Sequence, residues 1–465
     1  MRRPLAEHLP STLVATLSAA FGVSLLETTG VLAQVISADT VTGEKDTVAL
    51  LLPLVASIFI VIAVYVGAIV TANTFETIIA GRTRTIALYR LIGSSAADQR
   101  RAVAREGLSV GAIGSVLGGV IGTVIAVSLI SLSIATGLVP SAVYRYVEPV
   151  IALPIVAVVL TTWLASWVGS RRVLQVSPIQ ATGAAVEKSL DEATGSRGRS
   201  VVAIVLFTVG GALLVLGMLI GLVNAAGVLV GVVGGLFSFT GLVLGSQLVM
   251  PIALRLTGRM FGRSAPARLA AENAVRYPER SSRTTIGLVI GVTLVTMFAV
   301  AVESYRAIIA AAQRSQPEEY QGTDQVLLVT VVVFSVLMGF SALIAAVGMV
   351  NNLSMSVLQR TRELGLLRAL GFTRRQVRTM ILAESAQLTV AAVLVGLVLG
   401  TFYGWAGAQS LLGSITGSPG LVIPAIPLGL LVILAGASAV LTLAASITQS
   451  RRATRIAPVA ALAVE

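Results

Sequence analysis

The chain has 465 residues, of which 55% are hydrophobic and 12% are charged, with a net charge of +12 and no cysteine. Soluble domains carry about 25% charged residues, so this composition excludes a soluble globular protein and indicates a polytopic membrane protein. Without cysteine, and with His8 as the single histidine, the chain has no ligands for a conventional zinc site and no residues for a Ser-His-Asp triad. We therefore expect neither a metal site nor a catalytic site.

The predicted elements are membrane-spanning helices, each of which needs about 20 mostly apolar residues. Ten segments meet this requirement and predict an all-α polytopic membrane protein. In chain order they are 12–36, 48–72, 107–136, 149–169, 201–223, 228–251, 284–305, 326–350, 383–411 and 422–448.

Basic residues indicate the orientation of these helices, because Lys and Arg near helix ends are retained on the cytoplasmic side. One set of helix ends holds 29 of the 33 basic residues, which predicts that both termini are cytoplasmic. This asymmetry accounts for the positive charge, so we expect no nucleic-acid partner. Arginine outnumbers lysine 31 to 2, which favours a bacterial plasma membrane. The outer segments are too short for an extracellular domain: 37–47, 137–148, 224–227, 306–325 and 412–421.

The sequence contains an internal repeat, because residues 81–108 match residues 359–386 at a constant offset of 278. A weaker similarity relates Gly22-Val23 to Gly291-Val292. Equivalent helices are separated by an even number of spans, so the two copies have the same orientation in the membrane. We expect two parallel four-helix repeats joined by two extra helices. The expected divisions are 1–182 (first permease-like repeat), 183–270 (linker and helices five and six) and 271–465 (second repeat).

Each copy of the repeat contains an amphipathic segment that ends at a glycine suited to stopping a helix, Gly93 or Gly371. Leu366 and Leu370 are four residues apart and are expected to share a face with Leu367. The pattern predicts a short cytoplasmic elbow that either lies on the membrane surface or inserts into a groove on a soluble partner. The candidate elbow residues are Arg82, Arg84, Leu88, Tyr89, Arg90, Ile92, Gly93, Glu106, Arg360, Arg362, Glu363, Leu366, Leu367, Arg368, Leu370, Gly371 and Glu384.

These residues resemble a known family. The stretch RTRELGLLRALGFTRRQVRTMILAES (360–385) is similar to the signature of FtsX-like permeases, the membrane subunits of MacB-type (type VII) ABC systems. The stretches 271–295 and SRRATRIAPVAALAVE (450–465) resemble other parts of that family, and the ten-helix layout resembles its bacitracin-export branch. The resemblance implies that the elbows dock a cytoplasmic ABC ATPase, present in two copies per chain.

The chain departs from the family pattern in one respect. Members usually carry a large extracytoplasmic domain between the first two helices of a repeat, whereas the gaps here are 37–47 and 306–325. Neither lysine, Lys45 or Lys188, stands in a phosphate-binding loop. We expect a transport subunit in contact with membrane lipid that is not itself an enzyme and binds no cofactor, with ATP and Mg on the partner ATPase.

The expected activity is ATP-driven export or extraction of an amphipathic, lipid-like or peptide substrate. One alternative is an ATP-driven regulator of a cell-envelope enzyme or sensor kinase, which would require a further envelope partner. The other alternative is an ATP-independent secondary carrier. The sequence leaves the substrate open.

Ionisable residues inside a membrane span are energetically costly and are therefore candidates for functional sites. Glu27, within 12–36, either faces a path for a cationic or amphipathic substrate, or reaches the outer interface or bonds a neighbouring helix. Glu303 is expected at the outer interface, paired with Arg306.

Aromatic and small residues have structural interpretations. Trp163 and Trp167 fit an interfacial belt rather than a ligand site. Small residues four apart predict close helix packing in lipid. They are Gly114, Gly118 and Gly122, Gly396 and Gly400, and Gly231 with Gly235.

Overall fold

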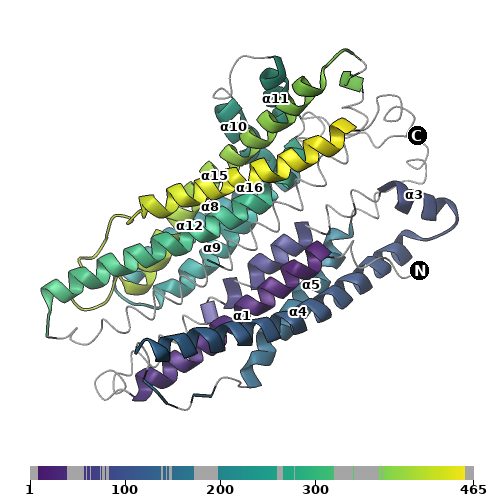
Figure 1. Cartoon of the computed structure of the whole chain (residues 1–465). Coiled ribbons are helices and arrows are strands. Elements are labelled where there is room, and N and C mark those ends of the chain that lie inside the picture. The colour runs from purple at the N-terminus through teal and green to yellow at the C-terminus, as the bar shows by residue number, and fades with distance from the viewer. Residues whose placement is uncertain are drawn as a thin grey trace. The chain divides into compact units, whose positions relative to one another are not determined.

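The protein is described by a computed structural model (Figure 1). The structure describes residues 9–38, most of 57–79, 83–137, 140–171, 197–258, 265–276, 278–318, Gly339 and 366–455, with short gaps in some of these ranges.

Every regular element among the described residues is helical, so the chain is an all-α polytopic membrane protein. The α-helices are α1 (Leu9–Ala38), α3 (Thr83–Leu91), α4 (Ala96–Ala135), α5 (Ala152–Gly169), α8 (Arg197–Gly221), α9 (Gly227–Leu244), α10 (Ser246–Gly258), α11 (Ala265–Arg276), α12 (Pro278–Ser315), α15 (Arg374–Leu412) and α16 (Leu428–Arg455), and a 3-10 turn, η2 (Pro149–Ile151), precedes α5.

Seven stretches of the described helices are long and apolar enough to cross a membrane. They are Ser11–Val31, Ala96–Ala135, Pro149–Gly169, Gly198–Gly221, Gly227–Leu244, Thr285–Ser315 and Arg374–Leu412. Each overlaps one predicted span. Two further predicted spans overlap shorter apolar helices, Ile60–Asn73 and Leu431–Val440, and the predicted span 326–350 lies almost wholly outside the described residues. The total of ten therefore stays a prediction.

The chain forms two compact units. In the first, α1 packs along α4, and α4 packs against α5. In the second, α12 packs along α15, and α15 packs against α16. The second unit also contains α8 and α9, which form a hairpin against α15. Each unit thus contains the same three-helix arrangement, while the predicted divisions at residues 182 and 270 stay predictions.

The α1–α4 and α12–α15 contacts are built on glycine at the same repeat positions, as predicted for close packing. A Cβ atom added to Gly122 would lie 2.7 Å from the carbonyl oxygen of Ala20, and one added to Gly400 would lie 2.6 Å from that of Thr293. Only glycine permits this backbone approach.

These two contacts also show which residue of α12 is the repeat counterpart of each residue of α1. Because Gly122 and Gly400 are repeat counterparts, Ala20 on α1 corresponds to Thr293 on α12. The predicted match of Gly22 with Gly291 would instead pair Ala20 with Val289, one helical turn earlier. That sequence match was therefore wrong.

The α8–α9 hairpin has glycines at a spacing that differs from the predicted Gly231–Gly235 pair. A Cβ atom added to Gly235 would have only a methyl group of Leu214 near it, at 3.9 Å. The close approach instead uses glycines spaced about two helical turns apart, because Cβ atoms added there would clash with the backbone of the opposite helix. These glycines are Gly210 and Gly217 on α8 and Gly227, Gly234 and Gly241 on α9.

Helix α12 continues past the predicted end at 305 and ends at Ser315. Ile308 and Ala312 in this extension are buried, and the Ser315 hydroxyl donates a hydrogen bond to the Gly417 carbonyl at 3.1 Å. The helix continues because the connection between α15 and α16 covers one of its faces. The predicted outer segment 306–325 is therefore partly helical.

Candidate functional site

The first elbow joins α3 to α4. Gly93 has a φ of +99°, and the Ser94 N–H donates to the Tyr89 carbonyl at 2.9 Å, which closes the left-handed turn. Ser95 then caps α4, its hydroxyl accepting a hydrogen bond from the Asp98 N–H at 3.0 Å. The sequence thus contains both the stop signal of one helix and the start signal of the next.

The second elbow repeats this geometry before α15. Gly371 has a φ of +98°, and the Phe372 N–H donates to the Leu367 carbonyl at 3.0 Å. Thr373 caps α15, accepting from the Gln376 N–H at 3.2 Å, while the Gln376 side chain accepts from the Thr373 N–H at 2.9 Å. Each of these backbone positions is the repeat counterpart of one in the first elbow, at the offset found in the sequence.

Both elbows expose the same pair of apolar side chains. Leu88 is 50% exposed and its counterpart Leu366 is 47% exposed, while Ile92 and Leu370 are 80% and 79% exposed. The members of each pair are four residues apart. Each elbow therefore presents a two-residue apolar ridge, which we call the elbow ridge, of the kind that fits a hydrophobic groove.

Leu367 lies on a different side of the second elbow from the ridge. It packs against a buried cluster formed by α11 and the start of α15 (Ala270, Val377, Met380 and Ile381). The prediction that Leu367 shares the face of Leu366 and Leu370 was therefore wrong, because adjacent residues on a helix are about 100° apart and the cluster partly covers Leu367. In the first elbow the matching residue, Tyr89, is 36% exposed.

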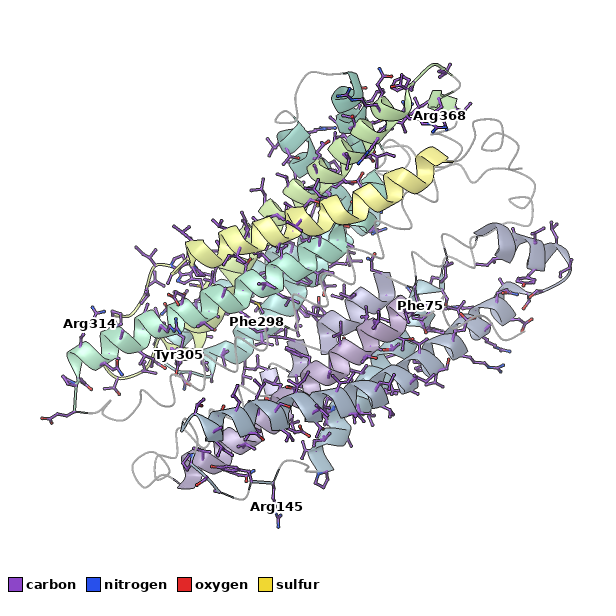
Figure 2. The ribbon with its side chains drawn as sticks, in the orientation of Figure 1. Phe75, Arg145, Phe298, Tyr305, Arg314 and Arg368 are labelled. Carbon is purple, nitrogen blue, oxygen red and sulfur yellow. The ribbon has the colours of Figure 1, made fainter. Side chains whose placement is uncertain are left out.

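The predicted charged residues are only partly described. Arg82, Arg360, Arg362 and Glu363 lie outside the described residues, and Arg84 and Arg90 are described only as positions on α3. Arg368 is partly buried and lies near the start of α15. In Figure 2 it is at the opposite end of the second unit from Arg314, which is at the end of α12. Glu106 is partly buried within α4, and Glu384 is 6% exposed within α15.

Each elbow is continuous with a long, unbroken helix. Helix α4 has 40 residues and α15 has 39, so each is about 60 Å long at about 1.5 Å per residue. The apolar core of a bilayer is only about 30 Å thick. Each elbow is therefore joined to a helix about twice as long as the apolar core of a bilayer is thick.

Arg100, on the first turns of α4, makes a contact that sequence reasoning missed. It donates hydrogen bonds to the Ser170 hydroxyl and the Trp167 carbonyl, both at 3.3 Å, at the end of α5. Trp167 is therefore a packing partner of α4 rather than a belt residue alone. No sequence signal pairs these residues, because they lie at the start of one helix and the end of the next.

The two predicted carboxylates in α1 and α12 have different surroundings. Glu27 is buried and accepts a hydrogen bond from the Thr123 hydroxyl of α4 at 2.7 Å. Glu303 is exposed and lies 3.4 Å from Arg306, as predicted. Among the residues that the structure describes, no group of three or more His, Asp or Glu side chains could hold a metal ion.

Comparison with known proteins places the chain in a family. The model of the FtsX-like permease C-terminal family matches residues 57–178 and 335–458. The separation between the starts of these two stretches equals the offset of the sequence repeat, so the family model matches each copy in the same register.

Three curated relatives that match parts of this chain are named as permeases. An uncharacterized ABC transporter permease of Bacillus subtilis, YknZ, is 35% identical over 101 residues, which are 22% of this chain and 24% of the relative. The ABC transporter permease YtrF of the same organism is 32% identical over 59 residues, 13% of this chain and 14% of the relative. The macrolide export ATP-binding/permease protein MacB of Bdellovibrio bacteriovorus is 38% identical over 60 residues, 13% of this chain and 9% of the relative.

The matched segments thus span no more than about a quarter of the length of these relatives. The family model, in contrast, covers more than half of this chain in two copies. The chain belongs to the FtsX-like permease family.

Proposed function

We propose that this chain is the transmembrane subunit of an ATP-driven ABC transporter in a bacterial plasma membrane. Its two elbows lie in the cytoplasm, with both chain termini, and each docks a separate ATPase subunit. The observation that carries the proposal is the pair of matching elbow ridges, Leu88 with Ile92 and Leu366 with Leu370. Two equivalent ridges call for a partner present in two copies.

The ATPase is a separate chain in this proposal. The two lysines of the sequence, Lys45 and Lys188, stand outside any phosphate-binding loop. ATP and Mg therefore bind to the partner, and this chain supplies the docking surfaces and the membrane path. The relatives named as permeases support this division of labour.

The geometry of the elbows suggests how the partner drives transport. ATP binding brings two ATPase subunits together, and each subunit displaces the elbow that it holds. Because Gly93 and Gly371 join the elbows directly to α4 and α15, the displacement moves these helices as levers. The glycine contacts with α1 and α12 lack interlocked side chains at Gly122 and Gly400, so the helices can slide there.

The substrate is proposed to be an amphipathic, lipid-like or peptide molecule that is exported or extracted from the membrane. The sequence leaves only short connections outside the predicted spans, so recognition falls to the helices within the bilayer or to the tips of the loops. A soluble, strongly hydrated solute would find few polar groups there.

The test is co-purification of the tagged full chain in mild detergent, with mass spectrometry of the proteins recovered. We expect an ATPase carrying a phosphate-binding loop at two copies per chain, lost when Leu88 and Leu366 are both changed to Asp. Ala97→Asp is the control, because it adds an Asp side chain at an exposed position on the first turn of α4, outside the elbow ridge.

Two results contradict the proposal. Recovery of no ATPase, together with solute transport by the chain alone in liposomes, indicates a secondary carrier. ATPase recovery without any substrate-stimulated ATP turnover indicates instead a regulator that acts on an envelope enzyme or sensor kinase.

A further inference from the structure

Glu27 has an open hydrogen-bonding position in the interior of the first unit. Its side chain is 3% exposed, and Thr123 donates to one carboxylate oxygen, Oε1, at 2.7 Å. The other oxygen, Oε2, is fully buried and has no hydrogen-bond partner. Buried polar atoms are normally paired, so an open carboxylate oxygen calls for an explanation.

A second open acceptor lies one turn away. Ser24 precedes Glu27 by about one helical turn, so the two side chains share a face of α1, and the Ser24 hydroxyl oxygen is also buried without a partner. The neighbouring hydroxyls are satisfied within the helix, because Thr28 donates to the Ser24 carbonyl at 2.6 Å and Thr29 donates to the Leu25 carbonyl at 2.8 Å. Ser11 and Ser18, nearer the start of α1, also carry buried hydroxyls without a partner, whereas the open carboxylate oxygen of this helix belongs to Glu27.

Helix packing does not explain the carboxylate. The glycine contacts align Ala20 with Thr293, so the counterpart of Glu27 in the second copy is Val300 of α12. The counterpart of Thr123 is Thr401. Val300 is fully buried, so an apolar side chain fills this position in the second copy. The two copies share their glycine contacts and differ in the carboxylate, which is consequently dispensable for bringing the helices together.

The site lies next to an exposed apolar face of α4. On α4, Val120 and Val124 flank Thr123 and are 61% and 59% exposed. An amphiphile in the bilayer can therefore place its chain against α4, while its head reaches the contact between α1 and α4. That contact is lined by Gly118 and Gly122, so the helices can part without unlocking large side chains.

The geometry points to Glu27, with Ser24, as a binding site for a nitrogen-centred cation carried by a membrane-soluble amphiphile, and we propose one such site per chain. An ammonium or guanidinium group donates N–H bonds to Oε2 of Glu27 and to Oγ of Ser24, and its positive charge compensates the buried carboxylate. The inference rests on the proposed transport function, whose substrate class it narrows to cationic amphiphiles.

The test uses the full chain in nanodiscs of phosphatidylcholine, without any ATPase. The probe is dodecylamine carrying a photoreactive diazirine, with unlabelled dodecylamine and dodecanol as competitors. We expect crosslinks in α1 and α4 around Glu27 and Thr123, displaced by dodecylamine and not by dodecanol. Glu27→Gln should weaken binding by about tenfold or more, because it removes the charge from a charge-assisted hydrogen bond.

The matched control is Glu303→Gln, which removes an exposed carboxylate from α12 and should leave dodecylamine binding unchanged. The proposal is overturned if dodecanol competes as well as dodecylamine, or if Glu27→Gln binds the amine with unchanged affinity. Thr123→Val is a second test variant for the case that Glu27→Gln is poorly produced. It keeps the shape of the contact and leaves Oε2 of Glu27 in place, so it should bind the amine to within a few-fold of the parent chain. Complete loss of binding in Thr123→Val would equally contradict the assignment of Oε2 as the acceptor.

The measurement is independent of the coupling elbows. Amine binding without ATPase recovery would contradict the proposed ABC function and keep the site. ATPase recovery without amine binding would contradict the proposed site and keep the ABC function.

Discussion

The guanidinium carbon of Arg100 lies 3.8 Å from the centroid of the Trp167 ring, so a cation on α4 stacks on an indole at the end of α5. The same guanidinium donates to the Trp167 carbonyl, one of the last carbonyls of α5, where a positive charge also complements the helix dipole. The contact fastens the start of α4 to the end of α5. In the second unit the matching residue, Arg378, is exposed.

Changing Arg100 to Ala should lower the free energy of unfolding of the first unit by about 1–2 kcal/mol, through loss of the cation–π contact and two hydrogen bonds. Arg100→Lys should give an intermediate loss, because lysine keeps the charge without the planar donors. Thermal unfolding of the detergent-solubilised protein measures both effects. Arg378→Ala is the control, and an equal loss in that variant would show that the effect is not specific to the stacked pair.

Gly122→Ala and Gly400→Ala should each destabilise the protein by about 1–3 kcal/mol, because the new methyl group meets a carbonyl oxygen of the facing helix and forces the helices apart. Gly211→Ala on α8 is the matched control, since an added Cβ there has no neighbour within 4 Å. That variant should be neutral or slightly stabilising, as alanine favours helix. Thermal unfolding of the three variants measures these changes in stability. Equal unfolding temperatures of all three variants would contradict the packing argument.

Gly93→Ala and Gly371→Ala should each cost about 1–2 kcal/mol locally, because an L-residue with a side chain disfavours the left-handed φ that both positions adopt. The expected result is faster hydrogen exchange of the backbone N–H groups of Ser94 and Phe372, which close the two turns. Asn at either position should restore part of the protection, since it tolerates this conformation better than Ala. Unchanged exchange in the Ala variants would mean that the glycines are not required for the elbows.

Gln409→Leu should release the connection between α15 and α16. The Gln409 side chain is fully buried, donates to the Gly420 carbonyl at 2.8 Å and accepts from the Val422 N–H at 3.1 Å. Leucine leaves both backbone groups without partners, at a cost of about 1–3 kcal/mol. Limited proteolysis should then cut within 413–427 in the variant before it cuts the parent chain. Gln316→Leu, at the end of α12, is the comparison variant and should keep the parent pattern.

Much of this architecture could be predicted from sequence because its signals are local. Apolar runs identify membrane helices, since each helix must satisfy its own backbone within lipid. The turns at Gly93 and Gly371 depend on residues within a few positions of one another, so the end of each elbow helix could be predicted from the sequence, whereas the start of the second elbow lies outside the described residues. The offset of the repeat was likewise visible in the sequence, and it agrees with the separation of the two family matches.

Contacts between distant segments were decided only by tertiary structure. The partial burial of Leu367 depends in part on α11, and the stacking of Arg100 depends on α5, and neither helix is encoded near the residue concerned. The one-turn error in matching α1 to α12 has the same cause, because small residues recur along both helices and the register is chosen by the glycines of α4 and α15. The sequence by itself determined the class of the protein and the shape of its elbows. Tertiary packing decided which elbow side chains stay exposed, and it left a single carboxylate oxygen, that of Glu27, open inside the described part of the first unit.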